Sequence, residues 1–171
     1  LLLIGAKPGN PAMQEAIKTV ALYPDGNGFE LKEALHKRYG VAHAGITLGN
    51  GSNDLLELAA RAFLAPGDEV VYSAHAFAVY ALATQAVGAK GISVPAAKDF
   101  GHDLAAMLAA AKKNKAKIVF VANPNNPTGT LLSGVALHDF LRKLPGDILV
   151  VLDEAYNEYL PEADRYDSVG W

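Results

Sequence analysis

Two continuous apolar runs, each followed by polar residues, constrain the fold of this chain more than any other feature. Residues 117–121 (KIVFV) lead into residues 123–129 (NPNNPTG), and residues 147–152 (DILVVL) end at Asp153. Strands buried on both faces have this continuous apolar character, whereas strands with one solvated face alternate. Further short strand candidates are residues 46–48, 69–72 and 90–94. Because helical patterns separate these candidates, the sequence predicts an α/β fold with a mostly parallel sheet sandwiched by helices.

Six segments have helical patterns. They are residues 11–21, 29–39, 54–64, 77–87, 103–113 and 134–143. Gly40 is placed to end the second of them, as glycine commonly does. No strand candidate precedes residue 41. We therefore expect residues 1–40 to form an N-terminal arm and small-domain segment, and residues 41–171 to form part of a larger, ligand-binding domain.

Composition argues against several classes of function. The 171 residues carry a formal net charge of -3 without a basic block, which suggests neither a nucleic-acid partner nor an anionic membrane. The absence of cysteine excludes disulfides, zinc–thiolate sites and thiol nucleophiles, and no histidine pair has the spacing of a metal site. The apolar opening Leu1-Leu2-Leu3-Ile4 is too short for a signal sequence or a membrane span. A cytoplasmic protein is expected.

A small-residue segment, Gly49-Asn50-Gly51-Ser52-Asn53, stands between a strand candidate and a helix. Backbone N–H groups at a helix N-terminus bind anions, so Gly51, Ser52 and Asn53 are candidates to hold a single phosphate. A dinucleotide fingerprint would need glycine where Asp54 stands. A turn followed by an N-cap is the alternative interpretation.

Two further segments follow the long apolar runs, and open α/β sheets bind ligands at this end of their strands. Residues 123–129 contain asparagine side chains that suit a ligand, and the alternative is a loop that only turns the chain. Asp153 is costly to bury without a partner, which indicates a carboxylate that pairs with a cationic ligand group. An N-cap is the alternative role for Asp153.

Five short segments together carry a family resemblance. They are Tyr23-Pro24-Asp25-Gly26, Gly51-Ser52-Asn53-Asp54, Ala76-Phe77-Ala78-Val79-Tyr80, Asn125-Asn126-Pro127-Thr128-Gly129 and Asp153-Glu154-Ala155-Tyr156. In this combination the chain resembles the class I/II, fold-type I pyridoxal-phosphate aminotransferases, and among them the histidinol-phosphate aminotransferases most closely. The resemblance implies that residues 41–171 are part of the cofactor-binding large domain.

The resemblance implies a set of residues around the ring of pyridoxal 5'-phosphate. Asp153 would pair with the pyridine nitrogen and keep it protonated, so that the ring acts as an electron sink. Asn126 and Tyr156 would hydrogen-bond the phenolic oxygen, and Phe77 would stack on the ring face. The Asn126-Pro127 bond is expected to be cis, because the family's loop must turn sharply to aim Asn126 at that oxygen.

The resemblance also implies where the phosphate is held. Gly51, Ser52 and Asn53 would bind it through their N–H groups. Tyr23 would reach the phosphate of the neighbouring subunit's cofactor, which implies a homodimer with shared sites.

The activity implied by the resemblance is transamination of L-histidinol phosphate with 2-oxoglutarate, a step of histidine biosynthesis. Threonine-phosphate decarboxylase and a general aromatic or aspartate aminotransferase are the alternatives within the family. A non-catalytic α/β phosphate-binding domain is the alternative of another class.

One departure from the family concerns the lysine that forms the Schiff base. In the family it follows a Ser-x-x-Lys segment, and none of the eleven lysines in this sequence has that context. We expect the lysine to lie beyond residue 171, and the chain to be cut at both ends, with Leu3-Ile4-Gly5 beginning inside the family's substrate segment. The 171-residue chain alone, with no catalytic residue of its own, is then expected to be inactive.

Overall fold

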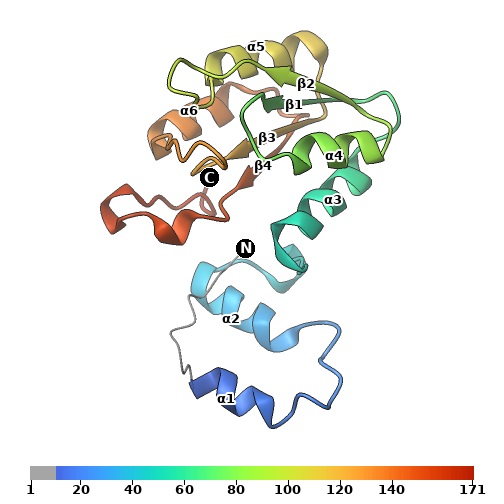
Figure 1. Cartoon of the computed structure of the whole chain (residues 1–171), viewed down its shortest axis with the longest axis vertical. Helices are drawn as coiled ribbons and strands as arrows, with labels where there is room; N and C mark the ends of the chain where they lie inside the picture. The colour runs from blue at the N-terminus through green and yellow to red at the C-terminus, as the bar shows by residue number, and fades with distance from the viewer. Residues whose placement is uncertain (1–10) are drawn as a thin grey trace. The chain divides into compact units, whose positions relative to one another are not determined.

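The computed structural model describes residues 11–171 and divides them into two compact units at the Leu48–Gly49 junction (Figure 1). The expectation for Leu3-Ile4-Gly5 lies outside the described residues, as does Lys7. Within the described range, no helix combines the length and apolar character that crossing a bilayer requires.

The first unit contains α1 (Pro11–Ile17), α2 (Phe29–Tyr39) and the short 3-10 helix η1 (His43–Gly45). α2 has the predicted bounds, and Gly40 ends it with a left-handed φ of 71°. α1 is shorter than predicted, because residues 18–20 form turns. The strand expected at residues 46–48 is wrong. Ile46 has extended backbone angles, but no strand of the described chain pairs with this segment, and a strand exists only through its partner.

The second unit is built on a four-stranded sheet. Its strands are β1 (Glu69–Ser73), β2 (Lys90–Val94), β3 (Ile118–Ala122) and β4 (Leu149–Asp153). They pair in the order β2-β1-β3-β4, and every pair is parallel. β3 is buried along its whole length, as its unbroken apolar sequence predicted. The α/β fold with a parallel sheet is confirmed.

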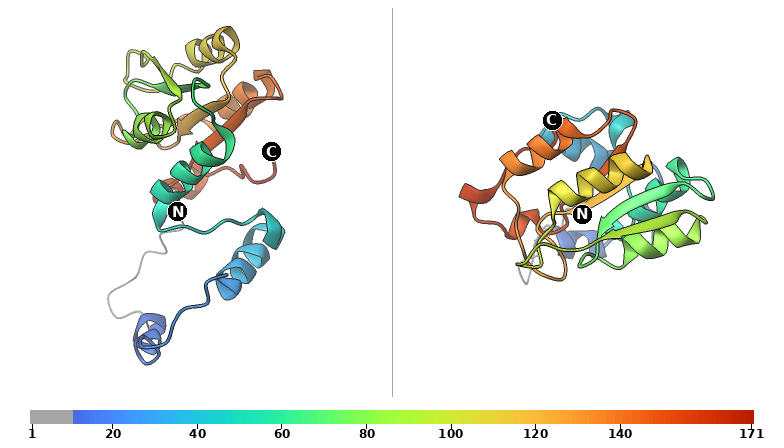
Figure 2. Two further views of the ribbon diagram at one scale, coloured as in Figure 1. Left: turned by 90° about the vertical axis from the view of Figure 1, so that its right-hand side faces the viewer. Right: turned by 90° about the horizontal axis from the view of Figure 1, so that it is seen from above.

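Helices cover both faces of this sheet (Figures 1 and 2). The helices of the second unit are α3 (Gly51–Phe63), α4 (Val79–Ala86), α5 (Leu104–Asn114) and α6 (Gly134–Lys143), with the short 3-10 helices η2 (Asn157–Tyr159) and η3 (Glu162–Asp164) near the chain end. Alternate residues of each strand point to opposite faces. On one face Val119 packs with α5 and α6, and on the other Phe120 packs with α3 and α4.

The strand order places a topological switch point between β1 and β3. The chain leaves β1 toward β2 on one side and later returns to form β3 on the other side of β1. The connections that follow β1 and β3 therefore diverge at the carboxyl ends of these strands. Ligands of open α/β sheets bind at such a point.

Candidate functional site

The loops that follow β1 and β3 are tied together at the switch point by Asn125. Its Nδ2 donates to the carbonyl oxygen of His75 at 2.7 Å and to Thr128 Oγ1 at 2.7 Å. The Asn125 side chain is buried. A buried polar group that is hydrogen-bonded across two loops holds both of them in one arrangement. Sequence analysis singled out this loop but did not predict the role of Asn125 as its brace.

Asn123 lies at the start of the same loop and is fully buried. Its side chain joins the two ends of the loop. Its Oδ1 accepts from the N–H of Leu132 at 2.8 Å, and its Nδ2 donates to Leu132 O at 3.0 Å. Nδ2 also lies 2.9 Å from the hydroxyl oxygen of Tyr166. Both Asn-Pro bonds of the loop are cis, so the prediction for Asn126-Pro127 is confirmed. The hydrogen bonds of Asn123 and Asn125 hold this loop in one arrangement.

Asn126 and Tyr156, which the family resemblance paired, lie next to each other. Asn126 Nδ2 stands 3.4 Å from the Tyr156 hydroxyl, which is long for a hydrogen bond. Asn126 comes from the loop after β3 and Tyr156 from the segment after β4. An amide and a phenol so placed, with Tyr156 exposed, can both donate to one oxygen atom of a ligand.

Asp153 ends β4 and is held by two donors. Tyr80 donates its hydroxyl to Oδ2 at 2.9 Å, and the N–H of Ala155 donates to Oδ1 at 3.2 Å. Among residues 11–171 no cationic side chain lies within salt-bridge distance of this carboxylate. Asp153 is not a helix cap either, because the next helix, η2, has Tyr156 at that position. The carboxylate is therefore oriented and keeps lone pairs for a cationic group.

Tyr80 is the residue that sequence analysis missed. It is fully buried, and its ring stacks on Phe120 at 4.9 Å between centroids and 3° between planes. Phe77 meets the same ring edge-on at 6.0 Å. Burial, and next the charge of Asp153, raise the pKa of the Tyr80 hydroxyl, so it stays a donor. The expected helix 77–87 would have placed Phe77 and Tyr80 on one face, since residues three apart share a helix face. In the structure α4 begins at Val79, so Phe77 precedes the helix.

The three residues predicted to hold a phosphate form the first turn of α3. Gly51 starts the helix with a left-handed φ of 80°, and its N–H already donates to Gly49 O at 3.0 Å. Asp54 turns its carboxylate back to the N–H of Asn50 at 2.9 Å, while the Asn50 side chain caps nothing. Within the described chain, the N–H groups of Ser52 and Asn53 have no acceptor, because N–H groups in the first turn of a helix have no partner within that helix. These two donors suit an anion.

Tyr23, the last of the predicted residues, belongs to the first unit. Its side chain is fully exposed, at 101% of the reference area. Its hydroxyl is therefore accessible to another molecule.

Glu154, beside Asp153, is a buried acid that takes no part in this arrangement. Ser168 Oγ donates to its Oε2 at 2.7 Å, whereas Oε1 is buried with no partner among residues 11–171. Burial raises the pKa of this carboxyl, and the hydroxyls of Ser168 and Tyr166 act in the opposite direction. The folded state therefore favours the protonated acid.

Glu154→Gln is expected to remove a pH dependence of stability. A carboxyl whose pKa is higher in the folded than in the unfolded state stabilises the fold below the unfolded value and loses that contribution as pH rises. As pH rises above the ordinary glutamate pKa of about 4.3, the wild type should therefore lose stability relative to Glu154→Gln. Urea unfolding at several pH values measures the difference. Glu162 is exposed, so Glu162→Gln is the matched control. The expectation would be contradicted if the difference in unfolding free energy between the wild type and Glu154→Gln changed with pH no more than it does for this control.

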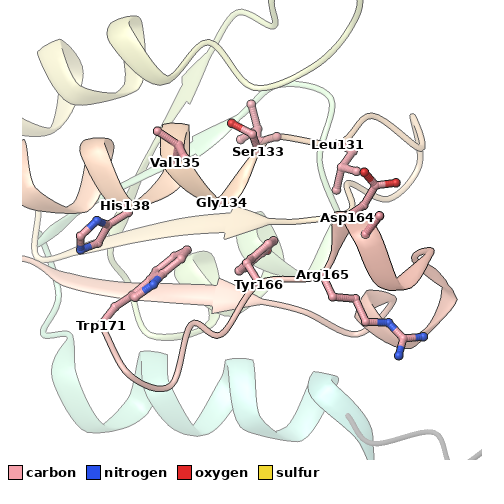
Figure 3. Close-up of a pocket in the computed structure, with 11 residues that line it drawn as sticks. Leu131, Ser133, Gly134, Val135, His138, Asp164, Arg165, Tyr166 and Trp171 are labelled. Atoms are coloured by element: carbon pink, nitrogen blue, oxygen red, sulfur yellow. The ribbon is translucent and has the colours of Figure 1, made fainter.

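A separate cavity of about 570 Å³ lies at the start of α6 (Figure 3). Its walls come from residues 131–135 and His138, and from residues 163–166 and Trp171. None of the residues predicted to bind a ligand lines it. The one arginine in its wall, Arg165, donates to the backbone oxygens of Leu160 and Glu158 instead of into the cavity. The polar edge of the sheet is therefore the better candidate site.

Comparison with known proteins identifies relatives along nearly the whole chain. The family model "Aminotransferase class I and II" matches residues 6–169. Histidinol-phosphate aminotransferase 2 of Ralstonia nicotianae is 59% identical over 160 residues, which are 94% of this chain and 42% of that protein. Histidinol-phosphate aminotransferase 2 of Nitrosospira multiformis is 62% identical over 160 residues, which are 94% of this chain and 40% of that protein.

A solved structure supports the same relationship. The crystal structure of histidinol-phosphate aminotransferase from Sinorhizobium meliloti in complex with pyridoxal-5'-phosphate matches with a TM-score of 0.85 at 32% identity. The match covers 92% of this chain and 42% of that one. The chain thus spans less than half the length of the relatives it matches. Because the family model covers almost all of its residues, the chain belongs to the aminotransferase class I and II family.

Proposed function

We propose that the natural protein containing this chain transfers the amino group of L-histidinol phosphate to 2-oxoglutarate, with pyridoxal 5'-phosphate as cofactor. The observation that carries the proposal is the oriented carboxylate of Asp153 at the carboxyl edge of the sheet, which has no cationic partner within the described chain. The identity of 59% and 62% with two histidinol-phosphate aminotransferases supports the choice of substrate.

The residues present fit the cofactor at three points. A carboxylate that keeps free lone pairs suits a protonated pyridine nitrogen, and Asp153 is such a group. The adjacent donors of Asn126 and Tyr156 suit a phenolic oxygen. The unpaired N–H groups of Ser52 and Asn53 suit a phosphate.

Each residue has a distinct task in this mechanism. Bound pyridoxal phosphate supplies an electron sink for the breaking of a bond at the substrate's α-carbon. Asp153 holds a proton at the ring nitrogen, and Asn126 and Tyr156 hold the phenolic oxygen. Phe77, half-buried beside Tyr80, covers a ring face, which orients the ring and excludes water. Gly51 contributes the left-handed turn that opens the first turn of α3 toward the phosphate.

The proposed assembly is a homodimer. The fully exposed Tyr23 would extend to the phosphate of the partner's cofactor. In this arrangement residues 1–40 are an N-terminal arm and small-domain segment, and residues 41–171 are part of the cofactor-binding domain.

Borohydride reduction of the natural full-length protein with bound pyridoxal phosphate is expected to label one lysine. That lysine should not be any of the eleven in this sequence. Each of these eleven lacks the Ser-x-x-Lys context. Peptide mass spectrometry locates the label. The 171-residue chain alone is the control, and it should bind the cofactor weakly and without one specific adduct. Stoichiometric labelling of one of these eleven lysines, in a protein that transaminates, would show that the lysine assignment is wrong.

Product analysis with the full-length protein tests the substrate. Glutamate formed from L-histidinol phosphate and 2-oxoglutarate supports the proposal. Carbon dioxide released from threonine phosphate, or a preference for aromatic amino acids or aspartate, would instead favour another activity of the same family. Phosphate binding without any turnover would favour the non-catalytic domain.

A further inference from the structure

We propose that Tyr80 is a positioning residue, whose hydroxyl orients the Asp153 carboxylate toward the pyridine nitrogen of the bound cofactor. This inference deepens the proposed function and rests on it. The contact joins residues 73 positions apart, from α4 on one face of the sheet to the end of β4.

The two oxygens of Asp153 are held in different ways. Oδ1 accepts from the N–H of Ala155, two residues along the same chain segment, at 3.2 Å. Such a local contact alone leaves the carboxylate free to swing with its own segment. Oδ2 accepts from Tyr80 at 2.9 Å, and this contact ties the carboxylate to another layer of the fold. With both oxygens held, the remaining lone pairs have a defined direction.

Tyr80 itself is enclosed by the core, which packs around its whole side chain. Its ring lies flat against Phe120, which is fully buried in β3, and Phe77 contacts its edge. Thr84 Oγ1 donates to the Tyr80 carbonyl oxygen at 2.6 Å, within the same helix. A hydroxyl on so rigid a support sets the position of its acceptor, not the reverse.

The charge state of the pair suits this role. Burial and the negative charge of Asp153 both raise the pKa of the Tyr80 hydroxyl, so the proton stays on the phenol. The donor that Tyr80 offers to Oδ2 is therefore a neutral hydroxyl. A lysine or arginine at this place would neutralise Asp153 and compete with the cofactor.

Tyr80 also connects two parts of the proposed site. Its ring contacts Phe77, expected on the face of the cofactor ring, and its hydroxyl contacts Asp153, expected at the nitrogen. One side chain therefore sets the spacing between the stacking ring and the acid. A phenylalanine would fill the same core volume but would leave Oδ2 without this donor.

The test compares two probes in the natural full-length protein without its cofactor. They are pyridoxamine 5'-phosphate, which binds without a covalent link, and its 1-deaza analogue, in which C–H replaces the ring nitrogen. Fluorescence titration gives the Kd of each probe. Tyr80→Phe is expected to weaken pyridoxamine phosphate roughly tenfold, about what loss of a hydrogen bond to a charged group costs. It should leave the Kd of the deaza analogue within roughly twofold, because that probe makes no bond to Asp153.

Tyr72→Phe is the matched control. Tyr72 packs on the same face of the sheet, but its hydroxyl lies beside Gly91 at the start of β2, and within the described chain it has no hydrogen-bond partner. This variant should leave both Kd values unchanged.

Each other outcome has a definite meaning. Equal weakening of both probes by Tyr80→Phe would overturn the inference, because a purely structural role affects both. No change in either probe would overturn it as well. Wild-type protein that binds neither probe would refute the proposed function first, and the inference with it. If Tyr80→Phe does not fold, replacement of Tyr80 by 3-fluorotyrosine keeps the hydroxyl but strengthens it as a donor; an unchanged ratio of the two Kd values would then overturn the inference.

Discussion

Asp153→Ala in the natural full-length protein is expected to lower kcat by two or more orders of magnitude, on the order of what loss of one preorganised electrostatic partner costs in other enzymes. The carboxylate is the one acidic group that the fold orients at the end of β4 through two donors. Without it the ring nitrogen loses its proton, and the electron sink weakens. Steady-state kinetics and unfolding curves of the same samples separate loss of activity from loss of structure.

Two further variants test whether the effect depends on the charge and on the position of this carboxylate. Asp153→Asn keeps the shape of the side chain and an acceptor for Tyr80, but lacks the negative charge, so kcat should fall nearly as far. Asp147→Ala removes an exposed carboxylate just before the other end of the same strand and should leave kcat unchanged. Wild-type turnover by a folded Asp153→Ala protein would refute the proposed role.

Phe120→Ala is expected to lower the free energy of unfolding by about 4 kcal/mol. Phe120 is fully buried at the centre of β3, where its ring stacks on Tyr80 and packs among residues of both α3 and α4. Removal of the ring leaves a cavity that a close-packed interior fills only in part. Urea unfolding monitored by circular dichroism measures the loss.

The matched control for this change is Phe63→Ala. Phe63 ends α3 with 60% of its surface exposed, so the same substitution should change stability by no more than about 0.5 kcal/mol. A Phe120→Ala loss as small as that of the control would show that β3 does not form the core described here.

The sequence alone determined the class of the fold and the ends of several elements. α2 and α6 have the predicted bounds, because helical periodicity and a terminating residue such as Gly40 are local signals. The continuous apolar character of β3 was likewise a local signal of burial on both faces. The pairing of Asn126 with Tyr156 came from the family resemblance, whereas the sequence pattern itself predicted only that the segments after the two strands share one edge of the sheet.

Other features depended on contacts between distant segments and could not be read locally. The strand expected at residues 46–48 failed for lack of a partner, and the order β2-β1-β3-β4 was not predicted, because pairing is decided by the whole sheet. α3 begins three residues earlier than expected, with Gly51 in a left-handed conformation and Asp54 bonded back to Asn50.

The candidate site shows the same division between sequence and tertiary structure. Sequence motifs indicated Asp153 as an acid with a cationic partner, but they did not identify which group orients it. Tyr80 could be read locally only as a core residue of the expected helix 77–87. Its hydroxyl meets Asp153 only after β1, β3 and β4 align side by side and α4 packs on one face of the sheet. Local patterns determine which residues are buried, whereas the direction of a buried polar group depends on a partner that only the assembled layers bring near.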